Sequence, residues 1–110
     1  MLNHELPAAL LPSAWVEALL GEWTVAQERL DESFSVATRG ANPRRKWEGG
    51  MRLHLVDTLL VRARLFAKRD LYPWPERTPR MDLEEAATLI DICGYHRRDE
   101  ELADAMAAIT

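Results

Sequence analysis

The feature that most constrains the fold is an apolar period of three and four residues that runs through residues 50–69. Apolar side chains recur there in steps of three, four, three and four, at Leu53, Val56, Leu60, Ala63 and Ala67. This spacing places them along one face of an α-helix, and Leu59 and Phe66 widen that face. The segment is therefore predicted to be a long helix that packs on one side and meets water on the other.

Four shorter segments show the same spacing, and turn-forming residues separate them. They are predicted to be helices with approximate bounds of 12–20, 23–39, 82–93 and 98–109. Gly21 and Gly94 stand where two of these helices are expected to stop. The apolar stripe of the first helix consists of Trp15, Val16, Leu19 and Leu20. By their spacing, Trp15 and Trp23 are expected in the core.

The composition agrees with a single all-α domain over residues 1–110. Hydrophobic residues make up 47% and charged residues 29%, which is ordinary for a globular chain of one domain. Good helix formers are frequent and β-branched runs are few. We read residues 1–11 as a leader that is helical only in part. Residues 71–81 are read as a Pro-rich loop insertion.

That loop holds prolines at positions 73, 75 and 79, which forbid a helix interior and favour an extended backbone. Tyr72 and Trp74 lie between them, and a helix is predicted to restart at Asp82. Two interpretations of the aromatic residues stay open. They either fold back to cover the open end of the core, or present a rigid aromatic surface to a partner.

Several positions resemble those of tetratricopeptide repeats, which are pairs of antiparallel helices packed through small residues. The segment 21–26 is similar to the turn and second-helix start of such a repeat, with Ala26 at its small position and Leu30 at the bulky one. Ala14 matches the small position of the first helix. A second unit is similar, with Ala63, Ala86 and Ile90 at the matching positions. The resemblance implies about two helical hairpins with a short C-terminal capping helix.

Residues 50–70 and 82–104 together resemble the last repeat of large bacterial proteins that join a repeat array to a signalling NTPase. No Gly-x-x-x-x-Gly-Lys-Ser/Thr motif is present, so a nucleotide-binding part is not expected. The resemblance implies a non-enzymatic protein–protein interaction module, either an accessory piece or a remnant of a signalling repeat protein. Because repeat arrays usually need about three units, either the final helix caps the array, or the protein pairs with itself or with a larger partner. Self-association is therefore a further expectation.

In such arrays the first helices of the pairs line the binding groove. The resemblance therefore implies a protein or peptide partner, contacted on the long helix by Arg52, Asp57 and Arg64. Tyr72 and Trp74 are added as candidate contacts because aromatic side chains are frequent at interface centres.

The charge distribution supports a second hypothesis. Although the net charge is −4, residues 39–80 hold eleven of the fourteen Lys and Arg residues, and both flanking segments are acidic. Either the segments neutralise one another within the fold, or the basic segment 39–80 serves a small helical nucleic-acid-binding or regulatory protein. The nucleic-acid contacts would then be Arg44, Arg45, Lys46, Arg97 and Arg98. Because the acidic ends would repel nucleic acid, we prefer the protein partner.

No pattern predicts catalysis, a cofactor or a metal site. His4, His54 and His96 lie far apart, and Cys93 falls on an apolar stripe, where a thiol behaves as a small hydrophobe. The single cysteine excludes an internal disulfide. Neither a secretory signal nor an apolar stretch of membrane-spanning length is recognisable, so a cytoplasmic location without a membrane partner is expected.

Overall fold

Residues 7–38, 52–69 and 71–109 are described by the computed structural model, and in these ranges the chain is all-α without a strand. The elements in chain order are α1 (Pro7–Leu19), α2 (Trp23–Thr38), α3 (Arg52–Phe66), α4 (Pro79–Cys93), the single 3₁₀ turn η1 (His96–Arg98) and α5 (Asp99–Ile109). The predicted all-α class is confirmed, and each helix lies within a few residues of its predicted place.

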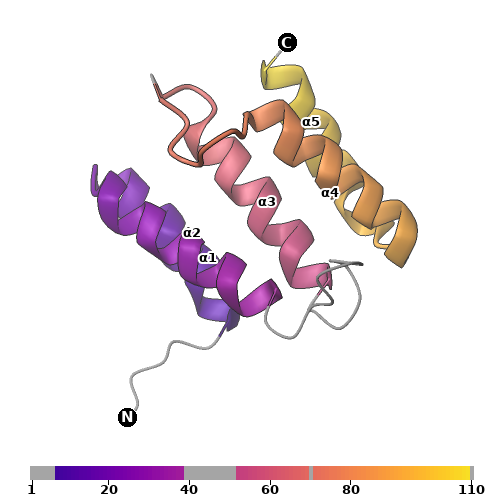
Figure 1. Ribbon diagram of the computed structural model, residues 1–110, viewed down its shortest axis with the longest axis horizontal. Coiled ribbons are helices and arrows are strands. Elements are labelled where there is room, and N and C mark those ends of the chain that lie inside the picture. The colour runs from indigo at the N-terminus through magenta and orange to yellow at the C-terminus, as the bar shows by residue number, and fades with distance from the viewer. Residues whose placement is uncertain (1–6, 39–51, 70, 110) are drawn as a thin grey trace.

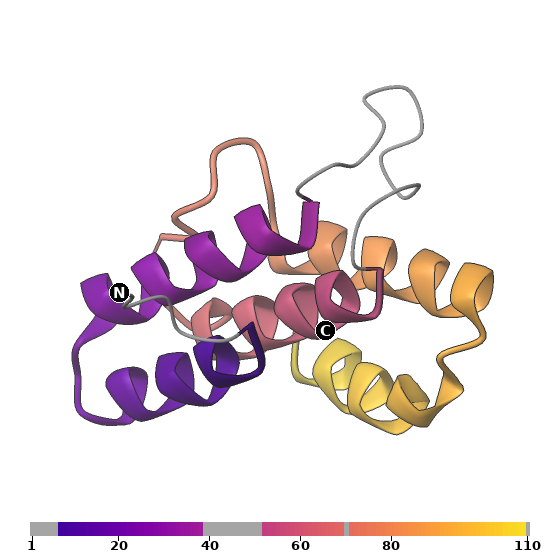
Figure 2. The ribbon, with the colours of Figure 1, turned by 90° about the horizontal axis from the view of Figure 1, so that it is seen from below.

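The helices form two antiparallel hairpins and a final helix (Figure 1). α1 pairs with α2, α3 pairs with α4, and α5 packs on both α3 and α4. α3 is the central element because it contacts each of the other four α-helices. In the view from below, α1 and α5 lie on one side of α3, while α2 and α4 lie on the other (Figure 2).

The small positions named in the sequence lie where helices cross. Ala14, Ala26, Ala63 and Ala86 are all buried, with at most 1% of each residue exposed. A larger side chain at such a crossing would hold the two helix backbones apart. The core has two parts: one lies between α1, α2 and the end of α3, and the other between α3, α4, α5 and the C-terminal part of α2.

α1 differs from its prediction in both its start and its buried face. It begins at Pro7, inside the expected leader 1–11, and Pro12 lies within the helix with its ring exposed. The buried side chains of α1 are Leu10, Ala14 and Ala18. Burial of Leu10 provides a packing reason for the extra turn before Pro12.

The predicted apolar stripe of α1 does not face the core. Val16, Leu19 and Leu20 are 54%, 81% and 71% exposed. Trp15 and Trp23 are half-buried rather than core residues. The cause is the position of α1 at the edge of the molecule, where it packs only on α2 and α3 and its outer face meets no other described element.

α4 begins three residues earlier than predicted, which shortens the Pro-rich insertion from 71–81 to 71–78. Thr78 is the N-cap, and its Oγ1 accepts the N–H of Met81 at 3.1 Å. Pro79 occupies the first helical position, where its fixed φ and missing N–H are favourable. Asp82 is therefore not a cap but a buried residue of the first turn.

Within the described part of the chain, no helix has the length and apolar character needed to cross a membrane.

Candidate functional site

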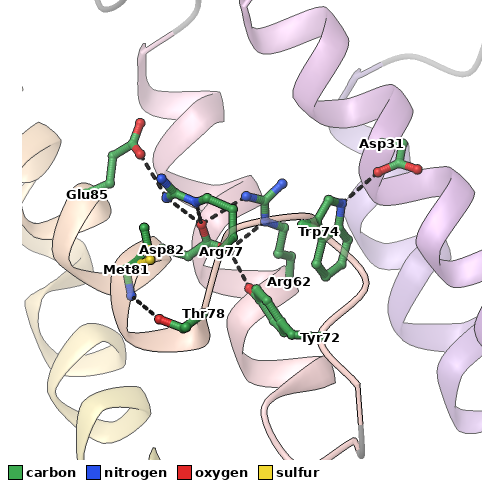
Figure 3. Close-up of polar contacts among 9 residues, drawn as sticks. All are labelled: Asp31, Arg62, Tyr72, Trp74, Arg77, Thr78, Met81, Asp82 and Glu85. Atoms are coloured by element: carbon green, nitrogen blue, oxygen red, sulfur yellow. Dashed lines mark hydrogen bonds and ion pairs between the residues drawn. The ribbon is translucent and has the colours of Figure 1, made fainter.

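A cluster of buried charges joins α3, the Pro-rich loop and α4, and Asp82 is its centre (Figure 3). Asp82 is fully buried, and Arg62 of α3 is 4% exposed. Arg62 Nε and Nη2 donate to the two carboxylate oxygens of Asp82, at 2.6 and 2.9 Å. This two-point geometry, in which two parallel N–H groups meet both oxygens, is the strong form of the arginine–carboxylate pair.

Two side chains of the loop also donate to the same carboxylate. Arg77 Nε and Nη2 donate to Asp82 Oδ1 at 2.9 and 2.6 Å, and the Tyr72 hydroxyl donates to Asp82 Oδ2. Arg77 Nη2 also donates to Glu85 Oε1 at 2.9 Å. Asp82 thus fixes both ends of the loop to the start of α4.

These contacts shift two pKa values in opposite directions. Burial alone would raise the pKa of Asp82, but the hydrogen bonds and charges of Arg62, Tyr72 and Arg77 outweigh it and hold that pKa below its usual value. Burial, together with the hydrogen bond to the Asp82 carboxylate, raises the pKa of Tyr72. At neutral pH the cluster therefore holds an ionised Asp82 and a neutral Tyr72.

Arg62 is enclosed by aromatic rings as well as by charge. Its guanidinium carbon lies 5.0 Å from the ring centroid of Phe34 and 4.6 Å from that of Trp74. Trp74 is 9% exposed, and its indole Nε1 donates to Asp31 Oδ1 of α2 at 2.7 Å. Edge-to-face contacts extend from Trp74 to Tyr72 and to Phe66, with centroids 5.0 Å apart in both pairs. Stacking and ion pairing together immobilise a side chain that is rarely buried.

A pocket of about 320 Å³, which we call the Trp74 pocket, opens beside this cluster between α2, α3, the loop and α4. Phe34, Leu55, Trp74 and Pro75 form its apolar lining. The polar lining comes from Asp31, Thr38, Arg62, Arg77 and Glu85.

A second cavity of about 290 Å³ lies on the other side of α3, where α1, α3 and α5 meet. We call it the α1–α3–α5 groove. Small and apolar residues line it (Ala63, Ala67, Ala105, Ala108 and Ile109), together with Trp15 and the charged Arg64, Lys68 and Asp104. Arg64 lies over the Trp15 ring, 5.5 Å from its centroid, and forms a long ion pair of 3.6 Å with Glu101.

The structure separates the five predicted partner contacts. Arg64 lines the α1–α3–α5 groove, whereas Tyr72 and Trp74 belong to the Asp82 cluster on the other side of α3. Asp57 binds within the fold: its carboxylate accepts from Arg98 Nε at 2.9 Å and from the Tyr95 hydroxyl at 3.3 Å. Arg52 is half-buried in the first turn of α3 and lines neither cavity.

The aromatic residues of the Pro-rich loop, Tyr72 and Trp74, pack against the core. This agrees with the first of the two interpretations of these residues.

The candidate nucleic-acid contacts divide in the same way. Arg98 is held by Asp57 and by Glu101, whose Oε1 lies 2.5 Å from Arg98 Nη1. Burial would lower the pKa of Arg98, but these carboxylates outweigh it and raise that pKa. Arg97 is exposed, with its guanidinium 5.7 Å from the Tyr95 ring centroid. Arg44, Arg45 and Lys46 lie outside the described residues.

A third polar cluster joins α2 to α3, and its protons can be assigned. Thr58 Oγ1 donates to the backbone oxygen of His54 at 2.8 Å. Thr58 has one hydroxyl proton, so Ser33 must donate in the 2.7 Å contact between the two hydroxyl groups. His54 Nε2 must then carry the proton that it shares with Ser33 Oγ at 2.8 Å. Because the proton of Ser33 points to Thr58 and Ser33 is fully buried, this pair is not an activated nucleophile.

Sequence reasoning did not identify Arg62 as a member of this site. It also did not predict that Asp82 is buried or that the ring of Phe34 lies beside Arg62. Arg62 did carry a signal: it lies one position before Ala63, next to the apolar face of α3. A charged residue so placed needs a buried counter-ion, and only a predicted helix pairing would have indicated Asp82.

The described residues contain no group of three or more His, Cys, Asp or Glu side chains arranged to hold a metal ion. Cys93 is half-buried at the last position of α4. Comparison with protein-family models, with curated proteins and with solved structures finds no match.

Proposed function

We propose that this protein is a non-enzymatic protein–protein interaction module of helical-repeat type, which binds a protein or peptide segment in the α1–α3–α5 groove. The observation that carries the proposal is the side-by-side arrangement of the first helices of both hairpins with α5 (Figure 2). Three helices that share one face form a surface onto which an extended or helical segment can be laid.

The lining of the groove suits such a partner. Its small side chains leave room for an inserted apolar side chain, and Trp15 with Arg64 provides the residue types that dominate binding energy at interfaces. Lys68 is exposed and forms no ion pair with the described residues. Arg64 forms one ion pair with the described residues, and that pair is long and partly exposed. Exposed pairs of this kind contribute little to folding, so both cations are available to a partner.

The same proposal includes a relationship to tetratricopeptide repeats, with the chain as an accessory piece or a remnant of a bacterial signalling repeat protein. The relationship to tetratricopeptide repeats is supported by the burial of Ala14, Ala26, Ala63 and Ala86, the positions at which that pattern requires small residues. Self-association is also proposed, because three large apolar side chains, Val16 and Leu19 of α1 and Leu20 in the turn that follows, are exposed. A monomeric mass by light scattering at high concentration would count against self-association.

No described residue favours the nucleic-acid hypothesis specifically. Of its candidate contacts in the described part of the chain, Arg98 is neutralised by Asp57 and Glu101. A steep loss of nucleic-acid affinity with added salt would be needed to support it.

The test compares two tryptophan substitutions on α5. Ala108→Trp places a large side chain in the groove, and Ala103→Trp places the same side chain on an exposed position that does not line it. Tagged wild type and both variants are used for affinity capture from native extract with nuclease and high salt, read by quantitative mass spectrometry. A protein recovered in stoichiometric amount by wild type and Ala103→Trp, and at least about tenfold less by Ala108→Trp, is the expected result. Equal recovery by all three proteins would contradict binding in the groove.

A further inference from the structure

The Trp74 pocket contains a buried cation that the fold does not use completely. Arg62 is 4% exposed, and Asp82 occupies its Nε and Nη2. The third nitrogen, Nη1, carries no contact in Figure 3 and makes no hydrogen bond or ion pair with the described residues. Nη1 is not one of the buried side-chain atoms without a hydrogen-bond partner, so it is accessible to solvent. Arg62 also lines the pocket. The two N–H groups of Nη1 are therefore donors available to a bound acceptor.

The charges around the pocket determine which kind of acceptor can approach. The positive charges of Arg62 and Arg77 are matched by Asp82 and Glu85. Asp31 then adds one negative charge at the rim, because it accepts only the neutral indole N–H of Trp74 and forms no ion pair with the described residues. Counted over Asp82 and the described residues that line the pocket, a free carboxylate or phosphate would meet a net negative charge. A neutral carbonyl oxygen would not meet this repulsion.

The surface that leads to the pocket is also acidic. Glu28 and Glu32 of α2 are exposed, stand three residues before and one residue after Asp31, and pair with no described residue. The half-buried Arg29 lies between Glu28 and Asp31 in the sequence, so these four residues of α2 carry a net charge of −2. An approaching segment is therefore favoured if it carries Lys or Arg.

The apolar part sets the size and polarity of what enters. Phe34, Leu55, Trp74 and Pro75 surround a space of about 320 Å³, near the lower end of the roughly 300–1,000 Å³ range of ligand pockets. That space accepts an aliphatic side chain and leaves no room for a large cofactor. The Pro-rich loop holds its wall rigid through Tyr72 and Arg77, so little order is lost on binding.

We propose that the Trp74 pocket is a second binding site, which takes a basic peptide segment anchored by one aliphatic side chain. The aliphatic side chain lies against Phe34 and Trp74, a backbone carbonyl of the peptide accepts from Arg62 Nη1, and a flanking Lys or Arg pairs with Asp31. A peptide supplies all three groups at once, which a simple anion does not. The site is separate from the α1–α3–α5 groove, since the two cavities share no lining residue.

The test is an NMR titration with three blocked peptides: acetyl-Lys-Lys-Leu-Lys-Lys-amide, its counterpart with Gly in place of Leu, and acetyl-Glu-Glu-Leu-Glu-Glu-amide. The signal followed is the Trp74 indole N–H, which bonds to Asp31. The first peptide is expected to shift that signal saturably. Replacing its Leu with Gly should weaken binding at least about tenfold, because the buried aliphatic group is lost. The acidic peptide should leave the signal unchanged.

Two protein variants separate the role of Asp31 from a general charge effect. Asp31→Asn keeps an oxygen that can accept the Trp74 indole N–H but removes the charge. Asp91→Asn removes an equal charge from an exposed position of α4 that does not line the pocket. Circular dichroism first verifies that both variants are folded. We expect roughly a two- to fivefold weaker affinity for Asp31→Asn and no change for Asp91→Asn, as is usual for an exposed ion pair.

Three results would overturn this proposal: no saturable shift of the Trp74 indole signal at millimolar peptide, equal binding of the acidic peptide, or equal weakening by both variants. A shift of the Trp15 indole signal alone would place the peptide in the α1–α3–α5 groove. That outcome would overturn the second site and support the proposed function. If Ala108→Trp recovers the partner as well as wild type does, the proposed groove is contradicted, but a saturable shift of the Trp74 signal still supports the second site.

Discussion

At the scale of single residues, the buried polar groups connect the helices to one another. Asp82 accepts from Arg62, Tyr72 and Arg77, and so joins α3, the loop and α4 at one carboxylate. A buried ion pair of this kind stabilises little relative to an apolar pair, but loss of one member alone costs about 3–5 kcal/mol because the other charge stays buried. The contact therefore favours one specific pairing of α3 with α4 over alternatives that would leave Arg62 without a counter-ion.

His54 connects α2 to α3 through Ser33 and gives the protein a pH-dependent stability. Burial lowers the pKa of His54 from 6.5, and the charge of Asp57 opposes that change only in part. In the range just below pH 6.5 the unfolded chain therefore binds more protons at His54 than the folded protein does. The His54 contribution to stability is complete above pH 6.5, falls as the pH drops through this range, and is constant below the folded-state pKa.

We expect wild type to lose free energy of unfolding between pH 7.5 and pH 5.5, and His54→Gln to lose less. Glutamine cannot titrate, but its amide N–H can still donate to Ser33. Urea unfolding at the two pH values measures both. Equal losses in the two proteins would show that His54 is not the titrating group. Asp82, whose pKa is held below 3.8, contributes only to a separate loss of stability in more acidic solution.

At the scale of elements, the ends of α4 show how local chemistry sets helix length. Thr78 caps its first turn, and Pro79 fixes φ at the first helical position. At the other end Gly94 has φ 69°, and the backbone N–H groups of Gly94 and Tyr95 both reach the carbonyl of Ile90. This left-handed residue ends α4 and turns the chain toward η1 and α5.

Gly94→Ala is expected to lower the free energy of unfolding by about 1 kcal/mol, because an L-residue with a Cβ is strained in the left-handed region. No other atom lies within 4 Å of the position that a Cβ would occupy, so the loss reflects backbone conformation alone. Gly94→Asn should lose less, since asparagine tolerates this region. Chemical denaturation of the three proteins measures the difference. An alanine variant as stable as wild type would contradict this account.

At the scale of the whole molecule, charges from the basic middle segment and the acidic C-terminal segment pair with one another. Every ion pair described above between the basic segment 39–80 and the acidic C-terminal segment lies within the fold, and the pairs are Arg62–Asp82, Arg64–Glu101, Arg77–Asp82, Arg77–Glu85 and Arg98–Asp57. Of the seven Lys and Arg residues of the basic segment that the structure describes, Arg62, Arg64 and Arg77 take part in these pairs. The first of the two interpretations of the charge pattern thus accounts for part of the basic segment.

The position of α4 against α3 depends on small side chains between them. Ala86 is fully buried, belongs to the core that contains residues of α3 and α4, and lines neither cavity. Ala86→Leu should therefore destabilise the protein by about 1–3 kcal/mol through overpacking. Ala103→Leu, at an exposed position of α5, should change stability by less than about 0.5 kcal/mol. Thermal unfolding followed by circular dichroism compares them, and equal melting temperatures would show that α4 does not pack as described.

The positions of the helices along the chain follow from sequence patterns alone. The periods of three and four located all five, and Gly21 and Gly94, both with positive φ, stand at two of the ends. The small residues at the crossings, such as Ala63 and Ala86, were also recognisable, because the close approach of two helices restricts side-chain size locally.

The tertiary structure decided which faces are covered and which charges are paired. Leu19 and Leu20 have the apolar character of core residues yet lie exposed, while Arg62 and Asp82 are charged yet buried. A periodic pattern describes one helix at a time, whereas burial depends on the neighbour that packs against each face. The counter-ion of Arg62 lies twenty residues away, and only the pairing of α3 with α4 brings the two charges together.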